Sequence, residues 1–172
     1  TCLYLLDMSV TLKVETFKKD SVLEIKDNWE KISNSIKSTA KLLNETGFNS
    51  ENIISYVAVI PIVYYIYNGG DYKESINKIE LRKYIVIAQL KQIFGTATNS
   101  ALTSIRKAMK KAPNDSFSME NLNKIRFTGD RTLLYDEEEI DAMFDTYEKD
   151  AYTFMILSLL YPEIAFSSAW TT

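Results

Sequence analysis

Residues 21–48 read SVLEIKDNWEKISNSIKSTAKLLNETGF, and their apolar side chains recur three or four positions apart. That spacing is typical of a helix with one apolar face. The face comprises Val22, Ile25, Trp29, Ile32, Ile36, Ala40 and Leu43. Ser21 and Glu24 have the spacing of a capping box, and Gly47 followed by Phe48 has the form of a Schellman ending. We therefore predict one long helix, with Trp29 in the core.

Helical periodicity continues along the rest of the chain. Residues 57–67 are apolar almost all round, which predicts a central buried helix that kinks or restarts at Pro61. Further helices are expected at about 76–94 (ended by Gly95), 102–109, 122–125 and 136–161. The fold class predicted for residues 1–172 is all-α, a single-domain irregular bundle of six to seven helices. Residues 1–19 are expected to form an irregular entry segment, extended at 10–14, and residues 163–172 an irregular tail.

The composition limits the chemistry that the chain can perform. The 172 residues include no histidine and a single cysteine, Cys2. This excludes Ser-His-Asp and Cys-His catalysis, histidine or thiolate zinc sites, and an internal disulfide. We predict a cytoplasmic protein with no cofactor, no metal and no catalytic centre; an enzyme built on carboxylates and tyrosines is the last-ranked alternative. Residues 57–67 are too few to span a membrane as a helix.

Two features near residue 100 are candidates for binding an anion. FGTATNS (94–100) places a glycine and hydroxyls before a helix, which suits a phosphate, although ordinary capping also explains it. Four cations follow near the end of the same helix, where they suit either the helix dipole or a nucleic-acid backbone. The predicted contacts with DNA phosphates are Thr98, Asn99, Ser100, Arg106, Lys107, Lys110 and Lys111.

Two other patterns favour a structural interpretation. The acidic run 136–139 is better explained as a solvated helix start than as a metal site, because adjacent helical carboxylates point in different directions. Tyr64, Tyr65 and Tyr67 are better explained as core residues than as a platform for base stacking.

Three stretches, in this order, resemble a known family: DNWEKI (27–32), SYVAVIPIVYY (55–65) and FMILSLLYP (154–162). They are similar to the region between the two catalytic domains of GmrSD-like, modification-dependent restriction endonucleases. The resemblance covers nearly the whole chain, to about residue 165. It implies an upstream ParB-like domain and a downstream HNH nuclease domain as partners in the same polypeptide. The family's Asp-Gly-Gln-Gln-Arg and histidine-rich motifs are not in this sequence, so no catalytic residue carries over.

The resemblance and the basic residues together predict a non-catalytic helical linker or scaffold of a GmrSD-like DNA restriction protein. It would be a fragment of a larger protein that positions the flanking catalytic domains and contacts DNA. The alternative is a protein–protein interaction module without nucleic-acid contact. Such a module would dock through apolar surface left exposed on residues 57–67 or 157–161.

Overall fold

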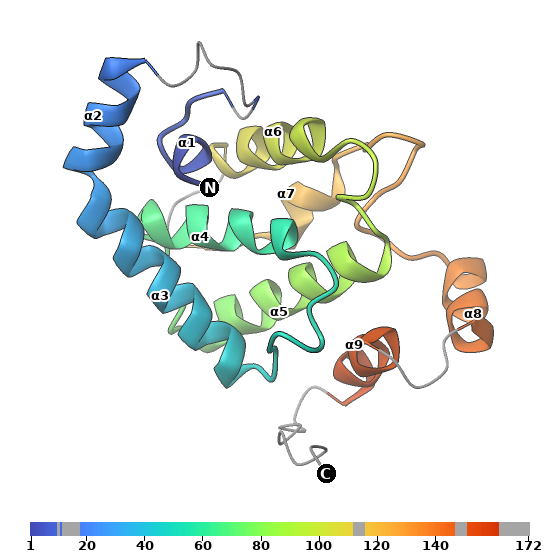
Figure 1. The fold of residues 1–172 in the computed structure, drawn as a ribbon. Helices are drawn as coiled ribbons and strands as arrows, with labels where there is room; N and C mark the ends of the chain where they lie inside the picture. The colour runs from blue at the N-terminus through green and yellow to red at the C-terminus, as the bar shows by residue number, and fades with distance from the viewer. Residues whose placement is uncertain (10, 12–17, 112–115, 147–150, 162–172) are drawn as a thin grey trace.

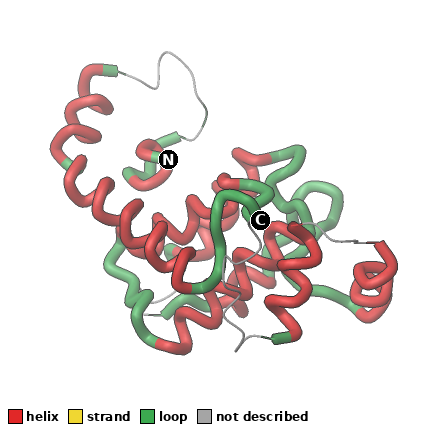
Figure 2. The backbone as a smooth tube through the Cα atoms, turned by 60° about the horizontal axis from the view of Figure 1, so that its bottom comes forward, coloured by secondary structure: helices red, strands yellow, loops and turns green. Residues whose placement is uncertain are grey.

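The computed structural model describes residues 1–9, 11, 18–111, 116–146 and 151–161. These residues form nine α-helices, one 3-10 helix and no strand, so the predicted all-α fold is confirmed (Figure 2). The helices are α1 (Cys2–Leu5), α2 (Lys19–Asp27), α3 (Trp29–Glu45), the 3-10 helix η2 (Tyr56–Val59), α4 (Ile60–Tyr67), α5 (Ser75–Leu90), α6 (Thr98–Met109), α7 (Met119–Asn123), α8 (Glu137–Thr146) and α9 (Ala151–Leu160). None of the helices in the described ranges is long and apolar enough to cross a membrane.

Of the two predicted irregular segments, only part of the entry segment 1–19 is described. The tail 163–172 and all of the connector 10–14 except Thr11 lie outside the described residues. Within the entry segment, however, α1 forms one helical turn, and its side chains Leu3, Tyr4 and Leu5 are buried. Three adjacent large side chains give this short helix an anchor in the core.

Helix α4 is the centre of the fold. Its residues from Pro61 to Tyr65, together with Tyr67, are buried, as the uniformly apolar sequence predicts. Pro61 lies in the first turn of α4, directly after η2, where its missing N–H costs nothing. Helices α1, α3 and α6 pack against α4, and Figure 1 shows α5 on the side of α4 opposite to α6. The docking surface predicted on 57–67 is therefore wrong, because this segment contains no exposed large apolar side chain.

The ending of α3 follows the sequence prediction. Gly47 has a left-handed φ of 87°. The Phe48 N–H donates to the Leu43 carbonyl at 2.8 Å, and the Gly47 N–H donates to the Asn44 carbonyl at 3.1 Å. These two bonds define a Schellman motif. Phe48 and Leu43 are both buried, which fixes the direction of the chain after the helix.

Helices α2 and α3 follow each other and together form what we call the helical arm. The start of this arm differs from the prediction. Helix α2 begins at Lys19, its N-cap is Lys18, and no side chain caps it, so the capping box predicted at Ser21 is wrong. The arm is also divided at Asn28, which lies between α2 and α3. The Asn28 side chain donates to the Glu24 carbonyl at 2.9 Å and accepts from the Tyr67 hydroxyl at 3.2 Å. Asn28 thus links the boundary between α2 and α3 to α4 by a hydrogen bond.

The face of α3 that packs on the core includes only two residues of the predicted apolar stripe, Ile32 and Leu43. The buried residues are Ile32, Ser35, Thr39, Leu42 and Leu43. The prediction that Trp29 lies in the core is wrong: three large side chains of the stripe are exposed, namely Val22 (51%), Trp29 (57%) and Ile36 (41%). The buried hydroxyls satisfy themselves within the helix, because Ser35 and Thr39 each donate to the carbonyl four residues earlier at 2.8 Å. Two polar residues of α3 therefore lie in the core together with apolar ones, while Trp29 and Ile36 face solvent.

Helix α5 ends earlier than predicted. It stops at Leu90 rather than continuing to Phe94 and Gly95. Gln92 adopts the left-handed conformation with a φ of 48°, and the Ile93 N–H donates to the Ala88 carbonyl at 3.1 Å. A residue other than glycine thus forms this ending, which sequence alone does not signal.

Candidate nucleic-acid interface

Helix α6 is amphipathic, with one buried apolar side and one polar side. Ala101, Leu102 and Ile105 are buried. On the polar side lies a hollow of about 460 Å³ whose lining includes Ser9, Thr11, Asn99, Ser100, Thr103 and Lys107. Hydroxyl, amide and ammonium groups all have N–H or O–H groups that can donate to an anion.

A second hollow of about 320 Å³ continues along the same helix. Its lining includes Ser104, Lys107, Lys111, Asn121 and Lys124. Ser104 and Lys107 line both hollows, so we treat the two as one surface and call it the α6 groove. Among the described residues that line the groove, none is a carboxylate. Lys124 is partly neutralised by Glu120, whose carboxylate lies 2.9 Å from it at the exposed edge.

The structure brings five of the seven predicted phosphate contacts into the lining of the α6 groove: Asn99, Ser100, Arg106, Lys107 and Lys111. Thr98 is not among the lining residues, and its hydroxyl donates to the Phe94 carbonyl at 2.9 Å. Lys110 points to the other side of the helix, where its ammonium lies 2.8 Å from the Asp7 carboxylate. The basic residues therefore divide by helical spacing, because side chains four residues apart share a face.

Arg106 lines the edge of the groove, but its guanidinium is hydrogen-bonded to the N-terminal segment rather than free to contact a ligand. Its Nη1 donates to the carbonyls of Tyr4 at 3.1 Å and Met8 at 2.9 Å. The guanidinium also lies over the Tyr4 ring, 4.9 Å from its centroid, and only 13% of the side chain is exposed. These contacts make Arg106 a positioning residue that attaches α1 to α6.

Asp7 is a residue of this region that sequence reasoning missed. It has a left-handed φ of 60° directly after α1, a conformation that Asp tolerates better than most residues. Its carboxylate accepts a hydrogen bond from the Tyr64 hydroxyl at 3.0 Å and pairs with Lys110. Burial, and then the hydrogen bond to Asp7, raise the pKa of Tyr64, so its hydroxyl stays protonated as a donor.

A cavity of about 180 Å³ lies beside the α6 groove, between α4, α6 and α7. Its walls include the aromatic side chains of Tyr65 and Phe117 and the amide side chains of Asn68 and Asn121. All three tyrosines of α4 are buried, as predicted for core residues, yet Tyr64 and Tyr65 also form part of the cavity wall.

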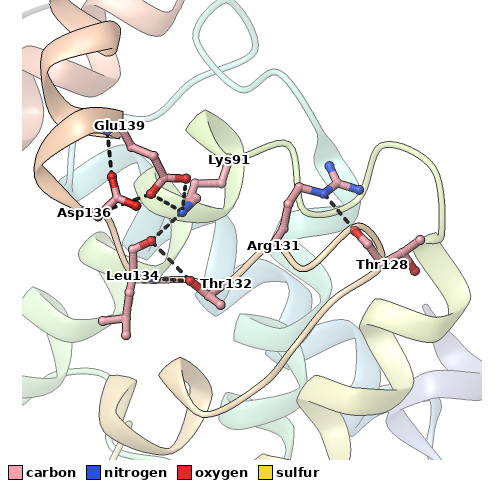
Figure 3. Close-up of polar contacts among 7 residues, drawn as sticks. All are labelled: Lys91, Thr128, Arg131, Thr132, Leu134, Asp136 and Glu139. Carbon is pink, nitrogen blue, oxygen red and sulfur yellow. Dashed lines mark hydrogen bonds and ion pairs between the residues drawn. The ribbon is translucent and has the colours of Figure 1, made fainter.

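A second polar cluster fastens the segment that precedes α8 (Figure 3). The Lys91 ammonium donates to the Leu134 carbonyl and to the Glu139 carboxylate, the latter at 2.7 Å. Arg131 donates from Nε to the Thr128 carbonyl at 3.1 Å. Sequence reasoning missed this cluster, because residues 91 and 131–139 lie too far apart in the chain for any local pattern to relate them.

The acidic run 136–139 forms a helix start, as predicted. The Glu139 N–H donates to the Asp136 carboxylate at 2.8 Å, and the Asp136 N–H donates to the Glu139 carboxylate at 3.2 Å. This reciprocal pair is a capping box. Across the described part of the chain, no group of three or more Asp, Glu or Cys side chains is arranged to hold a metal ion.

No protein-family model matches this chain, and a comparison with curated proteins finds no significant match.

Proposed function

We propose that this chain is a non-catalytic helical module that binds the phosphate backbone of DNA in the α6 groove. The observation that carries the proposal is the lining of the groove, where hydroxyls, amides and the ammonium groups of Lys107 and Lys111 meet without a carboxylate. Backbone binding needs donors and positive charge spread along a surface, and it needs no single deep pocket.

The resemblance to the region between the catalytic domains of GmrSD-like restriction proteins supports the same proposal. A module at that place would hold DNA for the flanking domains and would need no catalytic residues of its own. The absence of histidine from the sequence agrees with this role. Arg106 and Lys110 contribute indirectly, since both secure the segment from Tyr4 to Met8 next to the groove.

The test is the salt dependence of binding to duplex DNA. Changing Lys107 and Lys111 together to Ala should weaken binding and reduce the slope of log K against log salt by about 2, one for each phosphate that is no longer neutralised. The matched control is Lys37→Ala with Lys41→Ala, an exposed lysine pair of the same spacing on α3. Equal weakening by the two pairs, or no binding by the wild type at low salt, would contradict the proposal.

A second candidate function is self-association through the helical arm. The observation that favours it is the exposed apolar side chains Val22 on α2 and Trp29 and Ile36 on α3, because a docked partner would cover this apolar surface. We propose a second copy of this chain as the occupant, because a two-fold interface needs the same patch on both partners.

Sedimentation over a range of protein concentrations tests this second candidate. Wild type should form dimers that Trp29→Ser with Ile36→Ser abolishes. The control is Ile76→Ser with Ile79→Ser, two exposed isoleucines on α5. A wild type that stays monomeric at every concentration would rule the dimer out.

A further inference from the structure

The cavity between α4, α6 and α7 adjoins the α6 groove. Ala108 and Asn121 line the cavity and also the second hollow, so the two spaces meet at these residues. Lys107 and Lys111 lie on the groove side of this boundary, and Tyr65 and Phe117 lie on the cavity side. A ligand that crosses the boundary would place an anionic end at the two lysines and its other end against the aromatic side chains.

The aromatic wall of the cavity is fixed in place. The rings of Tyr65 and Phe117 pack edge to face, with centroids 5.3 Å apart and planes at 78°. Gly70 permits this position of Tyr65, because a Cβ on Gly70 would lie 2.4 Å from the ring. The Phe117 N–H donates to the buried Asn77 side chain at 3.0 Å. The wall is therefore formed before any ligand arrives, which reduces the entropy lost on binding.

The polar groups of the cavity favour a neutral ligand with hydrogen-bonding edges. The charged groups of its lining, Asp7 and Lys110, neutralise each other at 2.8 Å. Asn68 and Asn121 bring amide groups to the same space, and Ser118 brings a hydroxyl. An amide side chain offers both donors and an acceptor, which matches the edge of a heteroaromatic ring.

We propose that the cavity receives one nucleobase, whose own phosphate lies at Lys107 and Lys111 in the α6 groove. This inference rests on the proposed function for the groove and deepens it. The ligand unit is a nucleotide, either within a strand or free. A base within a strand would leave the stack to enter, at a cost that is least for single strands. Aromatic walls and amides would then replace its stacking and pairing.

The test compares strands that differ by one base. The probes are an oligomer of abasic deoxyribose phosphate units, the same oligomer with a single base at its centre, and a free nucleoside monophosphate. Wild type should bind the oligomer with one base about tenfold more tightly than the abasic oligomer, as one aromatic contact with a base predicts. Ala108→Phe, which fills the opening, should remove this difference, so that the variant binds the two oligomers equally.

Asn121→Leu is the second variant, since it removes an amide group without adding bulk. It should reduce the tenfold preference even if Ala108→Phe fails to fold. Equal binding of the two oligomers by wild type would overturn the inference and leave the proposed function standing. If no strand binds, the proposed function fails. Saturable binding of the monophosphate, weakened by Asn121→Leu, would then support a free nucleotide as the ligand, and its absence would overturn both.

Discussion

Arg106 and Lys91 attach different segments to the helical core by similar contacts. Arg106 donates to two carbonyls of the segment from Tyr4 to Met8 and lies over the Tyr4 ring. Lys91 donates to the Leu134 carbonyl and lies 4.8 Å from the centroid of the Tyr135 ring. Each cation also has a carboxylate partner, Asp7 for Arg106 and Glu139 for Lys91.

The difference between the two attachments is what they bury. The segment held by Arg106 places Tyr4 and Leu5 in the main core and buries Leu3 beside them. The segment held by Lys91 buries one large apolar side chain, Leu133, in the same core and leaves its neighbour Leu134 exposed. Similar hydrogen bonds should therefore stabilise the protein to different extents, since more apolar burial accompanies the first attachment than the second.

The largest effect is expected from Arg106→Met. This change removes donors from two carbonyls and leaves Asp7 without one of its cations, so we expect the unfolding free energy to fall by about 3 kcal/mol. Urea denaturation measures this change. Lys107→Met, on the groove side of the same helix, serves as control and should stay within about 0.5 kcal/mol of wild type. Comparable destabilisation by the two variants would show that Arg106 has no special structural role.

Lys91→Met should cost about half as much, roughly 1.5 kcal/mol, because Lys91 donates to one carbonyl where Arg106 donates to two. The same urea measurements provide the comparison with Arg106→Met. Glu139→Gln separates the carboxylate from the carbonyl contact and should cost only a few tenths of a kcal/mol. A destabilisation by Lys91→Met as large as that by Arg106→Met would end the distinction between the two attachments.

Local signals in the sequence predict much of the fold. The ending of α3 depends on Gly47 and its two neighbours, so the motif is visible in a few adjacent residues. The apolar sequence of α4 leaves no polar face, so burial on all sides follows directly. The packing face of α3 was not predictable in this way, because Ser35 and Thr39 satisfy their hydroxyls within the helix and then behave as small core residues.

The candidate site was predictable only in part. Its basic residues are adjacent in sequence, and helical spacing separates Lys107 and Lys111 from Arg106 and Lys110. Which pair faces the groove depends on where α1 packs, and no local pattern fixes that. Asp7 precedes Lys110 by about a hundred residues, so only the tertiary structure brings the two together.

Tyr4→Phe tests the buried tyrosine beneath Arg106. The Tyr4 hydroxyl donates to the Leu102 carbonyl at 3.0 Å, so removing it should cost about 1 kcal/mol. Tyr84→Phe is the matched control, because Tyr84 is also fully buried and its hydroxyl has no hydrogen-bond partner among the described residues. Removing that hydroxyl should leave stability unchanged or raise it slightly. A larger destabilisation at Tyr84 than at Tyr4 would show that the hydrogen bond to Leu102 is not what stabilises this region.

The smallest effect is expected from alkaline pH. Burial raises the pKa of Tyr4 far above its usual value of about 10, so the folded protein keeps a proton that the unfolded chain releases. The stabilisation from this tyrosine is complete below about pH 10 and declines as the pH rises further. By linkage, the decline for Tyr4 is roughly 0.4 kcal/mol at about pH 10. Urea unfolding at pH 8 and pH 10 should show a smaller drop in Tyr4→Phe than in wild type. Lys91→Met should show the full drop, because it leaves Tyr4 untouched. A drop unchanged in Tyr4→Phe would mean that burial does not keep the Tyr4 hydroxyl protonated.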